Sequence, residues 1–248
     1  MFVTTLFVTN MFVMVGGVSE EPRVARSRRE RPAKPALTRA GIVAAAVAVM
    51  DAEGLEKVTM RRLAAELDTG AASLYVYFRN AAELRAAVLD ELLAAVDLSP
   101  AAAEGDWEDR LRQVLWSYVR VLMRYPPLAD SALLTRPSGA RYLDLVEAVL
   151  ALLRAGGLDD RRAAWAVDVL LQFATATGAE QAAHDANPDD DAEQIALAAA
   201  VDSADAERYP RIRALGADLL SGPGEVRGGW GLSVLINGIL ATPRPDPE

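Results

Sequence analysis

Apolar residues recur at helical spacing from Leu37 onward. One helical face collects five of them at positions i, i+3, i+4, i+7 and i+8: Ile42, Ala45, Ala46, Val49 and Met50. Thr38 is a candidate N-cap, because its side-chain oxygen can accept a hydrogen bond from a free N–H of the first turn. Gly54 stands where a helix commonly ends. The pattern therefore predicts an amphipathic helix between Thr38 and Gly54.

Three more helices are predicted between residues 59 and 96. Thr59 is a candidate N-cap for the first, which ends at the break over 68–70. A short helix is expected over 71–78, and Asn80 is expected to cap a longer one over about 81–96. Two short helices joined by a tight turn containing a glycine are typical of a helix-turn-helix, whose second helix fits the major groove of DNA.

The rest of the chain also follows helical periodicity. Helices are expected over about 107–125, 126–134, 138–155, 160–183, 191–202, 210–220 and 225–240. Ser138 and Asp159 are the candidate N-caps of the third and fourth of these. No convincing strand pattern occurs anywhere. We therefore expect an all-α fold, with a three-helix helix-turn-helix unit at 37–82 and a larger helical domain at 83–248.

Composition narrows the chemistry of this helical protein. The absence of cysteine excludes disulfide frameworks, thiolate metal sites and cysteine nucleophiles. The single histidine, His184, argues against a Ser-His-Asp enzyme and against a metal site with several histidines. Its place beside an acidic stretch favours an exposed or capping role. We therefore predict no enzyme activity, no bound metal and no cofactor.

The net charge of −9 is unevenly distributed along the chain. Residues 22–62 contain ten basic and four acidic residues, a net charge of +6, whereas residues 91–248 contain 14 basic and 25 acidic ones, a net charge of −11. The basic end can attract nucleic acid while the acidic remainder repels it. The charge pattern thus predicts two modules with different partners.

The N-terminal residues 1–36 form neither module. Residues 1–18 are apolar, but they lack the basic n-region of a signal peptide and fall short of the ~20 apolar residues that span a bilayer. We expect an apolar tail, with Met11 and Met14 as alternative start positions and a membrane anchor as the competing interpretation. Residues 19–36 are rich in Pro, Arg and Ser and are expected to form a flexible basic arm.

The segment from Leu37 to Leu92 resembles the tetracycline-repressor (TetR) family of bacterial transcription regulators. The resemblance rests on Glu-Gly-Leu at 53–55, Thr-Met-Arg-Arg-Leu-Ala at 59–64 and Leu-Tyr-x-Tyr-Phe-x-Asn at 74–80. It implies that Thr59 and Tyr75 contact phosphates. The predicted DNA-contacting set comprises Arg39, Thr59, Arg61, Ala71, Ala72, Ser73, Tyr75, Tyr77 and Arg79. Leu74 and Phe78 are expected in the core, and Ala81 stands where the family usually has lysine.

The resemblance extends more weakly over the C-terminal part, and implies that 83–248 is a ligand-binding and dimerisation domain. The family's metal-binding histidine corresponds to Ala132 and a further drug-contacting histidine to Gln172, so we expect no Mg²⁺–tetracycline binding. A remaining ligand pocket is predicted around Trp116, Tyr118, Met123, Arg136, Tyr142, Gln172, Phe173 and Thr175. Dimer contacts are predicted for Trp165, Asp168, Ala176, Trp230, Leu232, Leu235, Ile236 and Ile239.

These features predict a cytoplasmic, homodimeric transcription repressor that binds a palindromic operator in double-stranded DNA and is released by a small-molecule effector. Two recognition helices about 34 Å apart would read successive major-groove faces. Two alternatives stay open. One is a helical small-molecule-binding protein or enzyme with a vestigial DNA-binding head, and the other is a regulator anchored to a membrane by residues 1–18.

Overall fold

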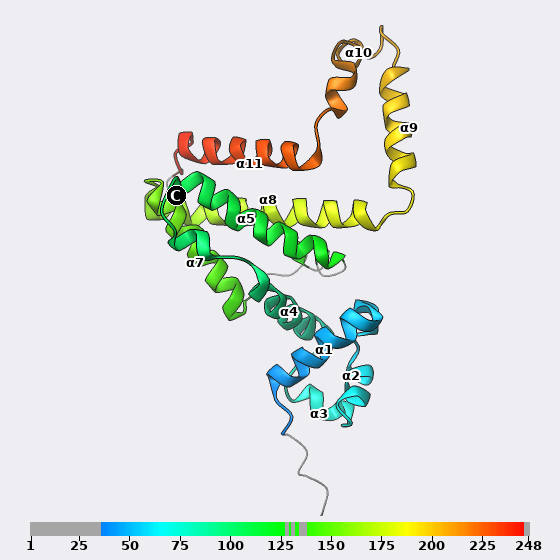
Figure 1. Cartoon of the computed structure of the whole chain (residues 1–248), viewed down its shortest axis with the longest axis vertical. Coiled ribbons are helices and arrows are strands. Elements are labelled where there is room, and N and C mark those ends of the chain that lie inside the picture. Colours follow the sequence, from blue (N-terminus) through cyan, green and yellow to red (C-terminus); the bar gives the residue numbers. More distant parts are fainter. Residues whose placement is uncertain (1–35, 127–128, 130–131, 134–137, 246–248) are drawn as a thin grey trace, which may run out of the picture. The chain divides into compact units, whose positions relative to one another are not determined.

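The computed structural model describes residues 36–126, 129, 132–133 and 138–245, and every regular element in these ranges is helical (Figure 1). The predicted all-α fold class is thereby confirmed. The predicted apolar tail, nearly all of the predicted basic arm, and Arg136 lie outside the described residues.

The N-terminal helices are α1 (Arg39–Glu53), α2 (Met60–Glu66), α3 (Ala71–Tyr75) and α4 (Ala81–Leu92), with a 3₁₀ turn η2 (Leu55–Lys57) after α1. Three of the four, α1, α2 and α4, begin at the predicted caps. The side-chain oxygen of Thr38 accepts a hydrogen bond from the N–H of Gly41 at 3.0 Å. Thr59 and Asn80 accept equivalent bonds at 3.1 and 2.8 Å. Gly54 ends α1 with φ +90°, a backbone conformation that favours glycine.

The third helix is shorter than predicted. It ends at Tyr75, and the N–H groups of Tyr77 and Phe78 both bond to the carbonyl oxygen of Leu74, at 3.0 Å each. This tight turn lets Phe78 join Leu74 and Leu63 in the core between α1, α2 and α4, where all three side chains are fully buried. The predicted core positions of Leu74 and Phe78 are confirmed.

The larger domain is built on three packed helices. They are α5 (Trp107–Arg124), α7 (Ala140–Ala155) and α8 (Asp160–Ala186), and each contacts the other two. Two 3₁₀ turns, η3 (Leu93–Ala95) and η4 (Ser99–Ala102), connect α4 to α5, so the predicted helix over 81–96 ends early at Leu92. Asp159 caps α8 through the N–H of Arg162 at 3.0 Å.

The expected N-cap of α7 is wrong. Gly139, not Ser138, occupies the N-cap position and offers no side chain. Instead, the carboxylate of Asp90 on α4 accepts a hydrogen bond from the N–H of Tyr142 at 3.0 Å. A residue 52 positions away in sequence therefore caps this helix, and local sequence pattern cannot reveal such a partner.

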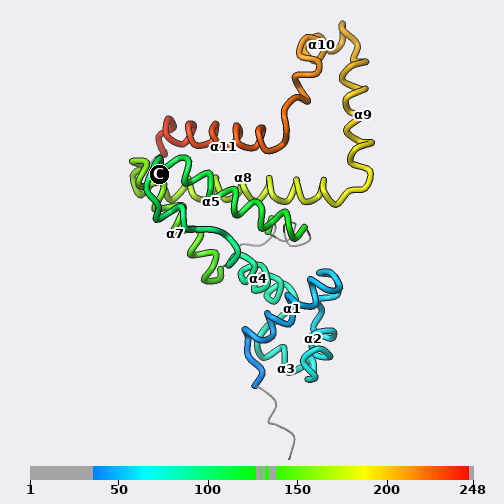
Figure 2. Tube along the Cα trace, viewed as in Figure 1, coloured from blue at the N-terminus to red at the C-terminus, as the bar shows by residue number. Residues whose placement is uncertain are grey.

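The chain then leaves the helical core and returns to it. Helices α9 (Asp190–Asp202) and α10 (Pro210–Leu215) and the 3₁₀ turn η5 (Gly216–Leu220) contact one another, and none of their residues is buried. Helix α11 (Gly224–Ala241) packs on α8 and α5, and the tube in Figure 2 shows it returning alongside α8. Its buried side chains are Leu232 and Ile236.

Candidate nucleic-acid interface and ligand groove

The second helix of the helix-turn-helix, α3, presents small and medium side chains to solvent. Ala72 and Ser73 are exposed near its start, and Tyr75 and Val76 are 53% and 82% exposed at its end. Ala71 is half-buried. The sequence analysis did not include Val76 among the candidate DNA-contacting residues. Its place in the Leu-Tyr-x-Tyr-Phe motif at 74–78, between two tyrosines of that set, could have suggested it. This surface offers hydroxyl groups for phosphates and methyl groups for the thymine edge.

Two of the predicted DNA contacts, Arg39 and Tyr77, form hydrogen bonds to other residues of the protein, although Arg39 is exposed. The Arg39 guanidinium donates to the carbonyl oxygen of Tyr77 at 2.7 Å and to the Glu83 carboxylate at 3.3 Å. It also lies 4.2 Å from the centre of the Phe78 ring. The Tyr77 hydroxyl donates to the carbonyl oxygen of Leu37 at 2.6 Å. These bonds tie the start of α1 to the end of α3, and they engage the Tyr77 hydroxyl proton within the protein.

The two arginines in the first turn of α2 have different surroundings. Arg62 donates to Glu53 at 2.5 Å and to Glu66 at 2.8 Å, and the bond to Glu53 lowers the pKa of Glu53. Arg61 is exposed and forms no ion pair with any residue that the structure describes. Arg61 is therefore the available cation, whereas Arg62 holds α2 against the end of α1.

Thr59 and Arg79 remain placed for phosphate contact. The oxygen of Thr59 accepts the cap bond of α2, which leaves the hydroxyl proton for an external acceptor. The Arg79 side chain is highly exposed and donates to Glu83 at 3.2 Å. The N–H and the side chain of Arg79 together lower the pKa of Glu83. The exposed members of the predicted set thus lie at the starts of α1 and α2 and on and after α3.

Among the residues that the structure describes, the predicted ligand residues lie in different surroundings. The Thr175 hydroxyl donates to the carbonyl oxygen of Leu171 at 2.7 Å, so the Tyr118 hydroxyl donates to Thr175 at 2.8 Å. Both residues are buried in the core between α5 and α8, and burial raises the pKa of Tyr118 to about 12. Gln172 is exposed on the outer face of α8 and Tyr142 lies in the first turn of α7. The predicted pocket around these residues therefore stays a prediction.

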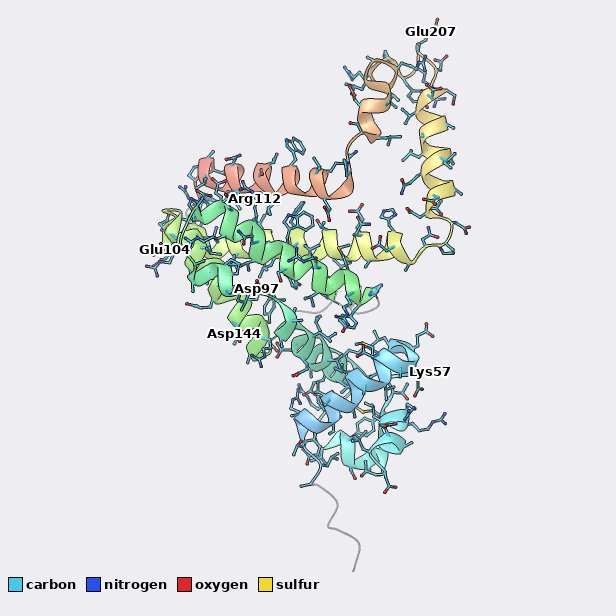
Figure 3. All side chains as sticks on the ribbon, viewed as in Figure 1. Lys57, Asp97, Glu104, Arg112, Asp144 and Glu207 are labelled. Atoms are coloured by element: carbon cyan, nitrogen blue, oxygen red, sulfur yellow. The ribbon has the colours of Figure 1, made fainter. Side chains whose placement is uncertain are left out.

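A groove of about 970 Å³ lies elsewhere, between α5, the end of α8 and the start of α11. Trp116 and Met123 are the two predicted ligand residues that line it. Phe173 instead packs beneath Gly231 of α11. The polar residues of the groove were not anticipated: Asp97, Arg112, Gln113, Arg120, Thr177, Gln181 and Glu225. Figure 3 labels Arg112 on α5 and Asp97 on the segment that precedes it.

The predicted dimer residues divide into two groups. Trp165 and Trp230 are 51% and 72% exposed, and Asp168 and Ala176 share the exposed face of α8. Leu235 and Ile239 are half-buried. Leu232 and Ile236 are only 3% and 1% exposed within a single chain, so their side chains pack in the protomer's own core. Sequence reasoning missed three exposed neighbours: Val169, Val226 and Val234.

Neither a metal cluster nor a membrane span is found in the described ranges. No group of three metal-ligating side chains occurs there, and none of the described helices is long and apolar enough to cross a membrane. His184 is exposed in the last turn of α8, where its Nδ1 lies 2.5 Å from the carboxylate of Asp190. This agrees with the exposed or capping role expected for it.

Comparison with known families covers both domains. Residues 42–88 match the model of bacterial regulatory proteins of the tetR family, and residues 99–242 match the tetracyclin repressor-like C-terminal domain. The chain belongs to the TetR family. The resemblance inferred from the helix-turn-helix motif is thereby confirmed.

Two curated TetR-type relatives show moderate identity. The HTH-type transcriptional repressor DrrR1 of Streptomyces coeruleorubidus is 37% identical over 133 residues, which cover 54% of this chain and 49% of the relative. The tetracycline repressor protein class D of Escherichia coli is 32% identical over 151 residues, which cover 60% of this chain and 69% of the relative. The chain thus spans about half the length of the first relative.

Solved structures match over more of the chain. The Streptomyces putative transcription regulator SCO7704 is 52% identical with a TM-score of 0.73, over 87% of this chain and all of that one. The Streptomyces coelicolor TetR family protein ActR, in complex with actinorhodin, is 33% identical with a TM-score of 0.74, over 84% of this chain and 97% of that one. The two-domain architecture is therefore shared with proteins of known fold.

Proposed function

We propose that the protein is a dimeric transcription repressor that binds operator DNA and is released by a small molecule. The observation that carries the proposal is the exposed surface of α3, with Ser73, Tyr75 and Val76 held outward over a fully buried core. A recognition helix needs this arrangement, because its base-reading side chains must project from a rigid support. The repressor DrrR1 and the class D tetracycline repressor support the same function.

Dimerisation follows from the apolar surface that the single chain leaves exposed. Trp165 and Val169 on α8, and Val226, Trp230 and Val234 on α11, face solvent in the protomer. Exposed large apolar side chains of this kind are typical of protein–protein interfaces, and tryptophan is enriched in their energetic centres. A second copy that covers α8 and α11 would supply the two-fold symmetry that a palindromic operator requires.

The effector would act by binding one dimer geometry better than the other. Ligand binding shifts the population toward the favoured state only through this difference in affinity. The groove beside α11 adjoins helices of the proposed dimer face, so its occupancy can change the separation of the two recognition helices. The actinorhodin complex of ActR supports small-molecule control. As a chromosome-binding regulator without catalytic function, the protein would act in the bacterial cytoplasm.

The test compares Arg61→Ala with Arg141→Ala, because each replaces an exposed arginine in the first turn of a helix. Binding to labelled DNA from beside the protein's own gene is measured by anisotropy at several salt concentrations. R61A should weaken binding by about tenfold and reduce the slope of log K against log salt by about 1, because one phosphate contact is lost.

The control R141A should leave affinity and slope unchanged, because Arg141 lies on α7 and forms only a loose 3.9 Å pair with Asp144. If R61A binds DNA with the affinity and the salt slope of the wild type, Arg61 does not contact DNA. A wild-type protein with no salt-sensitive, sequence-selective DNA binding would refute the proposed function as a whole.

A further inference from the structure

Helix α5 has two functionally different faces. Tyr118 and Leu122 point into the core against α8, where the Tyr118 hydroxyl is satisfied by Thr175. Trp116, Arg120 and Met123, spaced i, i+4 and i+7, instead line the groove. The opposite wall consists of Thr177 and Gln181 on α8 and residues 223–226 at the start of α11. The groove is therefore separate from the core that sequence reasoning took as the ligand pocket.

The Trp116 ring gives the groove a fixed aromatic surface. A Cβ atom placed on Gly228 of α11 would lie 2.9 Å from the ring, which is too close for a real contact. Glycine at this position lets α11 pack directly on the indole. Because the ring is held from that side and also lines the groove, it offers a preorganised surface for stacking.

Arg120 is the available cation of the groove. Arg112 is neutralised by Glu108 at 2.8 Å and by Asp109 at 2.9 Å. Arg120 is exposed and forms no ion pair within the described part of the chain. The Asp97 carboxylate also lines the groove. It accepts a hydrogen bond from the N–H of Ser99 at 2.9 Å and attracts Arg120 electrostatically, without an ion pair between the two side chains. A guanidinium with free donors beside an aromatic ring is well suited to a planar acidic group.

We propose that this groove binds a flat aromatic molecule bearing an anionic group, with its rings stacked on Trp116 and its anion paired with Arg120. The inference deepens the proposed function, because it names the chemical class of the effector. Glu225, which also lines the groove, disfavours a second negative charge at the α11 end. Val226 lines the groove and belongs to the exposed apolar face of α11, so the ligand contacts a helix of the proposed dimer interface.

The experiment uses two fluorescent probes of similar shape and different charge. 1-Anilinonaphthalene-8-sulfonate is an aromatic anion, and N-phenyl-1-naphthylamine is its uncharged counterpart. Each is titrated into the full chain and into four variants. Arg120→Gln should weaken binding of the anionic probe by about tenfold and leave the neutral probe unchanged, because only the charged hydrogen bonds are lost.

The other variants fix the interpretation. Glu225→Gln should increase the affinity for the anionic probe by about twofold. Trp116→Leu should lower the affinity for both probes, because the stacking surface is lost. Arg124→Gln is the matched control, since Arg124 is exposed on the next turn of α5 and does not line the groove. It should change neither probe.

Equal affinity of the wild type and R120Q for the anionic probe would overturn the inference, and so would an equal loss of both probes in R120Q. Operator binding is measured in parallel without probe. If the wild type binds DNA and R120Q keeps its anion affinity, the groove assignment fails and the repressor function stands. If the probe pattern holds and DNA binding is absent, the groove assignment stands and the repressor function fails.

Discussion

The contact between Asp90 and the start of α7 gives the sharpest prediction, because one carboxylate links two helices that are far apart in the sequence. Asp90 on α4 accepts the N–H of Tyr142 at 3.0 Å, at a helix start whose N-cap residue is glycine. Asp90→Ala removes an N-terminal cap, which costs about 1 kcal/mol. It also removes a negative charge from the positive end of the helix, which costs about 0.3–1 kcal/mol more.

We therefore expect Asp90→Ala to lower the free energy of unfolding by about 1–2 kcal/mol, or Tm by about 3–8 °C in a chain of this size. Asp90→Asn should lose about half as much, because the amide oxygen still accepts the bond. The measurement is urea denaturation followed by circular dichroism. Asp144→Ala is the control, because Asp144 is an exposed carboxylate on α7, the helix that Asp90 caps.

Gly139 provides an independent check of the same contact. A Cβ atom at this position would lie 2.0 Å from the Asp90 carboxyl carbon, so Gly139→Ala must displace the carboxylate. The backbone φ of −83° accommodates alanine, so the effect is steric only. G139A and D90A should destabilise less together than their sum, since each breaks the same bond. Equal unfolding midpoints for D90A and D144A, or strict additivity with G139A, would refute the capping role.

Three further predictions concern separate contacts. Tyr118→Phe should lower the free energy of unfolding by about 1 kcal/mol, measured by urea denaturation, because it removes the hydrogen bond to Thr175. Ultraviolet titration of the wild type should show one tyrosine that ionises only near pH 12. His184 should give a single NMR titration with a pKa above 6.5, because its imidazolium donates a hydrogen bond to Asp190. This pair stabilises the α8–α9 junction fully below pH 6.5, and the stabilisation is lost as the pH rises through the raised pKa. Asp190→Asn should return the pKa of His184 toward 6.5. Arg39→Met should lower Tm without changing the salt slope of DNA binding, because its guanidinium bonds to Tyr77 and Glu83; a reduced slope would instead place Arg39 on a phosphate.

Features that depend on neighbouring residues were predictable from the sequence. Thr38, Thr59, Asn80 and Asp159 each accept a hydrogen bond from an N–H three residues ahead, so the cap is complete within one turn. The helix-turn-helix and the family were found for the same reason, since the motif residues are contiguous. The cap of α7 was not found, because its acceptor comes from α4.

The aromatic and polar residues of α5 indicated a ligand-binding surface, but residue type alone could not show which face of the helix lines it. Tyr118 and Trp116 are two positions apart on α5, yet one bonds to Thr175 in the core and the other lines a groove. The same limit applies to α11, where Trp230 is exposed and Leu232 is buried. Both leucine and tryptophan favour burial, and their order along the helix does not say whether the covering surface is α8 or a second chain.

Local patterns and charge counts were enough to predict the all-α class, the principal caps, the helix-turn-helix and the split into a basic N-terminal part and an acidic remainder, because each depends on residues close together in the sequence or on simple counting. Which arginines carry no ion pair, which aromatic rings line a groove and which apolar residues stay exposed became known only from the packing of the helices. Those outcomes depend on partners far away in the chain: Arg39 bonds across 38 residues to Tyr77, and Trp116 meets Gly228 of α11. Packing between distant segments, rather than local propensity, therefore sets the chemistry of both surfaces.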